Sequence, residues 1–110
     1  MPAALPFWLS PDQVAVAPIS RDHSDYAARV LDALEAQGIR GVLFAGADTL
    51  SRRIVAAHEA SVPVVAIVGQ LEVQQGTVSL RERAGAVSVL PLADAIRALR
   101  RRARPGQDTE

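Results

Sequence analysis

The run Val64-Val-Ala-Ile-Val68 stands near the middle of the chain, between Pro63 and Gly69. All five residues are apolar and all but Ala66 are β-branched, which is typical of a strand buried on both faces. Both faces of such a strand are usually covered by helices that connect parallel strands. The run therefore predicts an α/β domain in which residues 64–68 form the central strand.

The segment before this run predicts a strand, a helix and a second strand. Residues 14–19 are an apolar stretch that follows Pro11 and indicates a first buried strand. Ser24 is a suitable N-cap for a helix that ends at Gly38. Residues 39–44 return to apolar, β-branched character and predict the second strand. The helix carries its apolar stripe on Tyr26, Ala27, Val30, Leu31 and Leu34.

A second helix is expected between residues 49 and 62, capped by Asp48 or Thr49 and ended before Pro63. After the central strand, polar and apolar side chains alternate in residues 77–81 and 87–89. This alternation predicts a β-hairpin with one face exposed to solvent. Pro91 then introduces a last helix. The whole order predicts an α/β fold with a largely parallel sheet that helices flank.

Length and composition indicate one small domain. The chain has 110 residues, 49% hydrophobic and 22% charged, which suits a single folded core. Residues 1–103 are expected to form the domain, and residues 104–110 a flexible tail. No cysteine, signal peptide or membrane-spanning run is present, so the cytoplasm is the expected compartment.

Charge sets a limit on nucleic-acid binding. Twelve basic residues, all of them arginine, balance twelve acids, so the formal net charge is zero. Binding to nucleic acid draws much of its free energy from phosphates that basic side chains neutralise. Any basic patch on this protein is therefore expected to be local. The arginines among residues 97–104 are expected to lie at the C-terminal end of a helix, where their positive charge complements the helix dipole.

The sequence offers no support for catalysis. Its two histidines, His23 and His58, stand alone and are expected at the surface. No phosphate-binding loop, nucleophile elbow or metal-ligand spacing occurs. We therefore expect a non-catalytic chain with no cofactor and no metal.

Two aromatic residues could stack on RNA bases or pack in the core. Trp8 precedes the first strand, and Tyr26 lies on the apolar stripe of the first helix. We expect Trp8 to close an edge of the core and Tyr26 to lie on the buried face of its helix.

Seven short motifs, in order and with preserved spacing, resemble the anticodon-binding domain of threonyl-type class II aminoacyl-tRNA synthetases. The similarity covers about residues 5–100. It begins with the entry segment that contains Trp8, Leu9, Pro11, Gln13 and Val14. It continues through H-x-D-Y-A from His23, G-I-R from Gly38, T-L-x-x-R-I from Thr49, V-P at Val62, G-x-x-E-V from Gly69 and G-T-V-S-x-R-x-R from Gly76.

This resemblance implies a mixed five-stranded sheet with three helices that binds tRNA, or another structured RNA, without catalysis of its own. Unpaired bases of an anticodon loop would be stacked and hydrogen-bonded on their edges. Glu72 and Arg81 match the acidic turn residue and the strand arginine of the family. Arg83 and Arg53 are the other expected RNA contacts.

Some positions depart from the family pattern. Gly46 and Ala47 stand where an arginine and an asparagine are usual, and Leu71 and Val55 stand where basic residues are common. Two alternatives to an RNA-binding module stay open, and the exchanges favour the first of them. The chain could be an interaction module that binds a synthetase or another protein, or it could be the C-terminal fragment of a synthetase.

Overall fold

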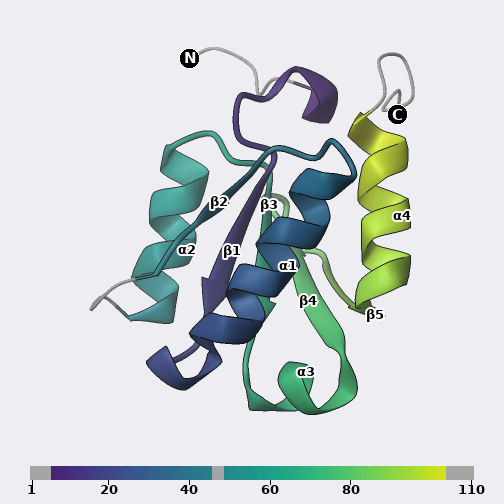
Figure 1. Ribbon diagram of the computed structural model, residues 1–110. Coiled ribbons are helices and arrows are strands. Elements are labelled where there is room, and N and C mark those ends of the chain that lie inside the picture. Colours follow the sequence, from purple (N-terminus) through teal and green to yellow (C-terminus); the bar gives the residue numbers. More distant parts are fainter. Residues whose placement is uncertain (1–5, 46–48, 104–110) are drawn as a thin grey trace.

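The computed structural model of the protein describes residues 6–45 and 49–103. Figure 1 shows the elements in chain order. They are the 3-10 turn η1 (Phe7–Leu9), β1 (Val14–Pro18), the 3-10 turn η2 (Arg21–His23), α1 (Ser24–Ala36), β2 (Gly41–Leu43), α2 (Leu50–Glu59), β3 (Val64–Val68), α3 (Gln70–Gln75), β4 (Thr77–Glu82), β5 (Val87–Pro91) and α4 (Leu92–Ala103). The expected tail at 104–110 and the exchanged pair at 46 and 47 lie outside the described residues.

The strands form one sheet in the order β2-β1-β3-β4-β5. The stretch from Val64 to Val68 is β3, which is fully buried and lies at the centre between β1 and β4. This confirms the predicted central strand and the mixed five-stranded α/β fold. The sheet is less parallel than expected, because β1 pairs in parallel with β2 and β3 whereas β4 pairs antiparallel with β3 and β5.

The described residues contain four α-helices, where three were expected. The additional helix is α3, which has only six residues and no buried side chain. It is too short to display an apolar stripe, so periodicity could not predict it. It ends at Gly76, whose φ of 68° lies in the left-handed region that glycine adopts readily.

Helices cover the two faces of the sheet unequally. On one face, α1 and α4 pack against alternate residues of β1, β3 and β4 and form the larger core with them (Figure 1). On the other face, α2 packs over a smaller core with β1 and β3. The hairpin of β4 and β5 extends beyond α2 on that face, where Val87 and Val89 are 51% and 57% exposed. The smaller core consists of Ala15, Ala17, Ala57, Val62, Val65 and Ile67.

The N-terminal turn η1 closes the larger core, but through a different side chain from the one expected. Phe7 is 1% exposed and belongs to that core, whereas Trp8 is only half-buried. A 3-10 turn directs neighbouring side chains to different sides, and only one of the two can point inward. The guanidinium of Arg102 lies 4.7 Å from the centre of the Phe7 ring.

Tyr26 packs against the larger core, as expected, and its hydroxyl reaches the sheet. Its O–H donates to the carbonyl of Thr77 over 2.9 Å and so links α1 to β4. Burial raises the pKa of the Tyr26 hydroxyl, and nearby Arg29 partly offsets that rise. Within the described residues, none of the helices is both long enough and apolar enough to cross a bilayer.

Candidate RNA-binding surface

The carboxyl ends of β1, β2 and β3 meet at one edge of the sheet, where α3 also lies (Figure 1). The chain leaves β1 through α1 on one face and leaves β2 through α2 on the other. In sheets with the order 2-1-3, ligands bind in the crevice that this change of direction opens. A hollow of about 330 Å³ lies there, lined by Pro18, Ile19, Ser20, Arg21, Ser24, Ala45 and Arg53.

Arg53 forms the buried wall of this hollow and is only 8% exposed. Its Nη1 donates to the carbonyl oxygens of Pro18, at 2.7 Å, and Phe44, at 2.8 Å. Its Nη2 donates to the carbonyl of Ile19 over 3.4 Å. The guanidinium therefore holds together the ends of β1 and β2, and its hydrogen-bonding geometry is that of a structural group.

Glu72 lies at the same edge, in the first turn of α3. Its Oε1 accepts a hydrogen bond from the Gly69 N–H over 2.8 Å. A carboxylate at the third position of a helix stabilises the helix start in this way. This contact fixes the direction of the side chain while it uses one of the two carboxylate oxygens.

Arg81 lies farther along β4, opposite Val65 on one side and Val87 on the other. The strand rises about 3.3 Å per residue, so Arg81 is about 13 Å from the start of β4 at Thr77. Its side chain shares the face of the sheet that α2 covers only in part. Its Nε is buried and has no hydrogen-bond partner among residues 6–45 and 49–103.

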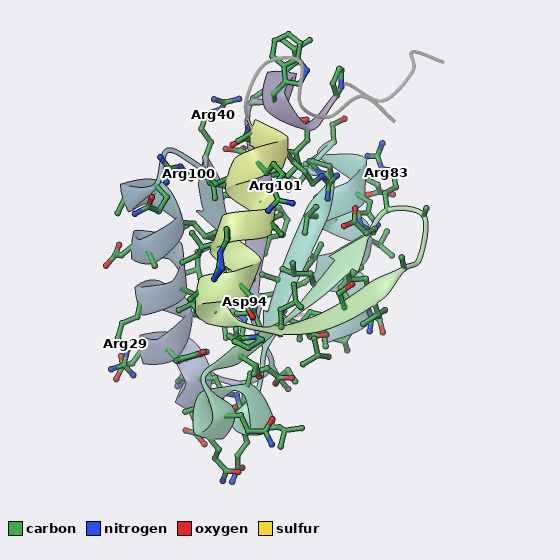
Figure 2. All side chains as sticks on the ribbon, turned by 90° about the vertical axis from the view of Figure 1, so that its right-hand side faces the viewer. Arg29, Arg40, Arg83, Asp94, Arg100 and Arg101 are labelled. Atoms are coloured by element: carbon green, nitrogen blue, oxygen red, sulfur yellow. The ribbon has the colours of Figure 1, made fainter. Side chains whose placement is uncertain are left out.

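Arg83 follows at the far end of the hairpin (Figure 2). Its Nη2 donates to the carbonyl of His58 and its backbone N–H to the carbonyl of Pro63. The four predicted contacts thus fall into two groups. Arg53 and Glu72 lie at the carboxyl edge of the sheet, and Arg81 and Arg83 lie toward the opposite end.

His58 is half-buried on α2, not exposed as predicted, because it lies beneath Arg83 at the end of the hairpin. Burial lowers the pKa of its imidazole, and the positive charge of Arg83 lowers it further. Its Nε2 is buried without a partner in the part of the chain that the structure describes. His58 is therefore held in its neutral form over a wider pH range than a free histidine.

Ser20, Arg21 and Ser24 form a polar wall of the hollow and are not among the residues predicted from the sequence. The signal was available, because a polar segment directly follows a fully buried parallel strand. Such a segment must lie at the carboxyl edge of the sheet. No group of three or more histidine, aspartate or glutamate side chains in the described ranges is arranged to hold a metal ion.

The fold and this edge define a small α/β domain whose polar hollow lies where parallel strands end. The chain belongs to the family described as the anticodon binding domain, which matches residues 13–102.

Several relatives and solved structures share this segment. The chain is 45% identical over 96 residues to threonine–tRNA ligase from Pyrobaculum neutrophilum, with 87% of the chain aligned. It is 43% identical over 102 residues to threonine–tRNA ligase from Caulobacter sp. (strain K31), with 92% of the chain aligned. In both cases the chain spans only 16% of the relative's length.

Among solved structures, the RNA binding domain of threonyl-tRNA synthetase from Cryptosporidium parvum Iowa II superposes with a TM-score of 0.83 at 28% identity. The match covers 87% of this chain and 24% of that one. Histidyl-tRNA synthetase from Nostoc sp. PCC 7120 superposes with a TM-score of 0.80 over 86% of this chain and 23% of that one. At 22% identity, the second likeness concerns the fold alone.

Proposed function

We propose that this chain binds the anticodon loop of a tRNA and has no catalytic activity of its own. Its membership of the anticodon binding domain family is the observation that carries the proposal. The relatives named above are threonine–tRNA ligases, so a threonine tRNA is the first RNA to test. The ligase activity of those relatives is not proposed for this chain, which spans 16% of their length.

The contact surface that we propose runs from the carboxyl edge along the face of β4. Glu72 would accept hydrogen bonds from a base edge, since a carboxylate only accepts when it is ionised. Arg81 is half-buried on β4, on the face that α2 covers only in part, and would donate to a base edge or a phosphate. A stretch of several unpaired nucleotides can extend over the length of about 13 Å that β4 spans between Thr77 and Arg81.

The other two arginines take different places in this proposal. Arg53 supports the surface from below, because its guanidinium donates to three backbone carbonyls. Arg83 is exposed at the end of the hairpin, where it would meet a phosphate of the loop or of the adjoining stem.

Fluorescence anisotropy with a labelled threonine-tRNA anticodon stem-loop tests the proposal. We expect binding at about 10 μM or below in low salt, with affinity that falls as salt rises. Arg81→Ala should weaken binding about 5- to 150-fold if the residue contacts a base edge, which corresponds to about 1–3 kcal/mol. If it contacts a phosphate instead, the slope of log affinity against log salt should fall by about 0.7.

Arg97→Ala is the matched control, since Arg97 is an exposed arginine on α4 that pairs with Asp94. It should leave binding to the stem-loop unchanged. Absence of binding at about 10 μM in low salt would overturn the proposal, and so would equal losses in the two variants.

Exposed apolar residues favour a second candidate, an interaction module that binds a synthetase or another protein. Val55 is 53% exposed on α2 and Leu71 is 56% exposed on α3, both at positions where the resemblance leads one to expect a basic residue. Under this alternative, the stem-loop would not bind, while Val55→Lys and Leu71→Lys would abolish co-purification with the partner.

A further inference from the structure

Strand β5 is the exposed edge of the sheet. Within the described part of the chain it pairs only with β4, and all of its residues except Leu90 are exposed. Figure 2 shows the strand running between the turn near Arg83 and the start of α4 near Asp94. Proteins usually protect such an edge with a charged side chain, a bulge or a covering element. Residues 87–91 carry no charge, and only Pro91 interrupts the row of donors.

The hydrogen-bonding phase of the hairpin decides which backbone groups face outward. The Glu82 N–H donates to the Ala86 carbonyl over 2.9 Å, so this pair is a hydrogen-bonded one. Bonded pairs recur at every second residue of an antiparallel ladder. The N–H and C=O groups of Val87 and Val89 therefore point away from β4. Those that point toward β4 belong to Ala86, Ser88 and Leu90.

We propose that β5 pairs antiparallel with β5 of a second copy of this chain, so that the two sheets become continuous. The outward groups are self-complementary in a register that places Val87 of one copy opposite Val89 of the other. Each such pair exchanges two hydrogen bonds, and the two-fold symmetry repeats the pair, which gives about four bonds. Pro91, which has no N–H, lies outside the bonded residues in this register.

The side chains and charges of the edge also suit a second copy. Val87 and Val89 would meet across the two strands on the face that α2 leaves open, and cross-strand pairs of β-branched residues stabilise a sheet. The formal net charge of zero adds no general repulsion between copies.

The dimer that this edge supports is a weak one. A single pair of short strands buries less surface than the roughly 1,600 Å² of a standard stable interface. We therefore expect the dimer to dissociate on dilution. The backbone edge of β5 is separate from the hollow and from Glu72, although Val87 lies opposite Arg81 on β4. The proposed pairing does not depend on RNA binding.

Sedimentation velocity on the full chain tests the proposal between about 10 μM and about 1 mM, the range in which an interface of this size should dissociate. We expect the mass to rise from 11.7 kDa toward twice that value. Val89→Lys should keep the chain monomeric, because it replaces the apolar pair of Val89 and Val87 across the strands and places the two lysines as diagonal neighbours with like charge. Val55→Lys is the matched control, because Val55 is exposed to a similar extent, at 53%, but lies on α2. It should dimerise like the unmodified chain.

Val89→Pro provides a second test that adds no charge. It removes an N–H that points outward and takes no part in the bonds to β4, so the hairpin should survive while dimerisation is lost. Circular dichroism would verify that both variants remain folded. A chain that stays monomeric at about 1 mM would overturn the proposal, as would a dimer that Val89→Lys and Val89→Pro leave intact.

Discussion

At the scale of single residues, His58 shows how an ordinary sequence position acquires an unusual environment. The chain around it resembles any exposed helix, yet Nε2 of its imidazole is buried and Arg83 donates to its backbone carbonyl. Burial and the neighbouring positive charge both disfavour the imidazolium form. Protonation of His58 is therefore linked to folding.

This linkage predicts a loss of stability in mild acid. The unfolded chain takes up a proton at His58 near the ordinary pKa of about 6.5, whereas the folded chain takes it up only at lower pH. The contribution of His58 to the free energy of unfolding is thus complete above about pH 6.5. It is lost as the pH falls from there through the lowered pKa.

Urea unfolding at pH 7 and pH 5 measures this effect. We expect His58→Gln to lose less stability between the two pH values than the unmodified chain, because glutamine does not titrate. Equal losses in the two proteins would show that His58 does not couple to folding.

At the scale of elements, the carboxyl edge is organised around one side chain. At the ends of β1 and β2, the carbonyl groups of Pro18 and Phe44 need hydrogen-bond donors. Arg53 on α2 donates to both of them. Thr49 fixes the start of α2 by accepting a hydrogen bond from the Arg52 N–H over 3.2 Å. One helix thus positions the donor that joins two strands and forms the wall of the hollow.

Replacing Arg53 by methionine should therefore destabilise the fold rather than only remove a charge. Methionine keeps much of the side-chain length but leaves the carbonyls of Pro18 and Phe44 unsatisfied, at a cost of about 2–4 kcal/mol in the free energy of unfolding. Arg52→Met is the control, since Arg52 is exposed on the same helix, and it should change stability by less than about 0.5 kcal/mol. Similar losses in both variants would show that Arg53 does not hold the edge together.

At the scale of the whole molecule, the N-terminal segment completes the larger core. Phe7 inserts beside α4, and Arg102 lies over its ring. Gln13 reaches back to the same segment, because its side-chain amide donates to the Phe7 carbonyl over 3.0 Å. Residues 6–13 are thus part of the folded domain.

Phe7→Ala should consequently cost about 3–5 kcal/mol in the free energy of unfolding, the usual cost of removing a buried aromatic side chain. Trp8→Ala should cost clearly less, since Trp8 is only half-buried. Chemical denaturation followed by circular dichroism compares the two without relying on tryptophan fluorescence. A larger loss in Trp8→Ala would contradict the assignment of Phe7 as the residue that closes the core.

Much of this protein follows from its sequence. The apolar run from Val64 to Val68 requires burial on both faces, so it predicts a central strand whatever else surrounds it. Gly38 and Gly85 mark the helix exit and the hairpin turn, where their φ angles of 80° and 104° favour glycine. The spacing of the family motifs then indicated the anticodon binding domain, which matches residues 13–102.

The tertiary structure alone decided which polar side chains share a surface. Arg53 and Arg81 are both basic and both match family positions. Arg53 is buried at the ends of two strands, however, whereas Arg81 lies on the sheet face that α2 covers only in part. Similarly, sequence could not distinguish Phe7 from Trp8, nor could it show that Val87 and Val89 direct their free backbone groups outward. Residue spacing determines which element forms, whereas burial and exposure depend on contacts between residues far apart in the chain, and no local pattern encodes those.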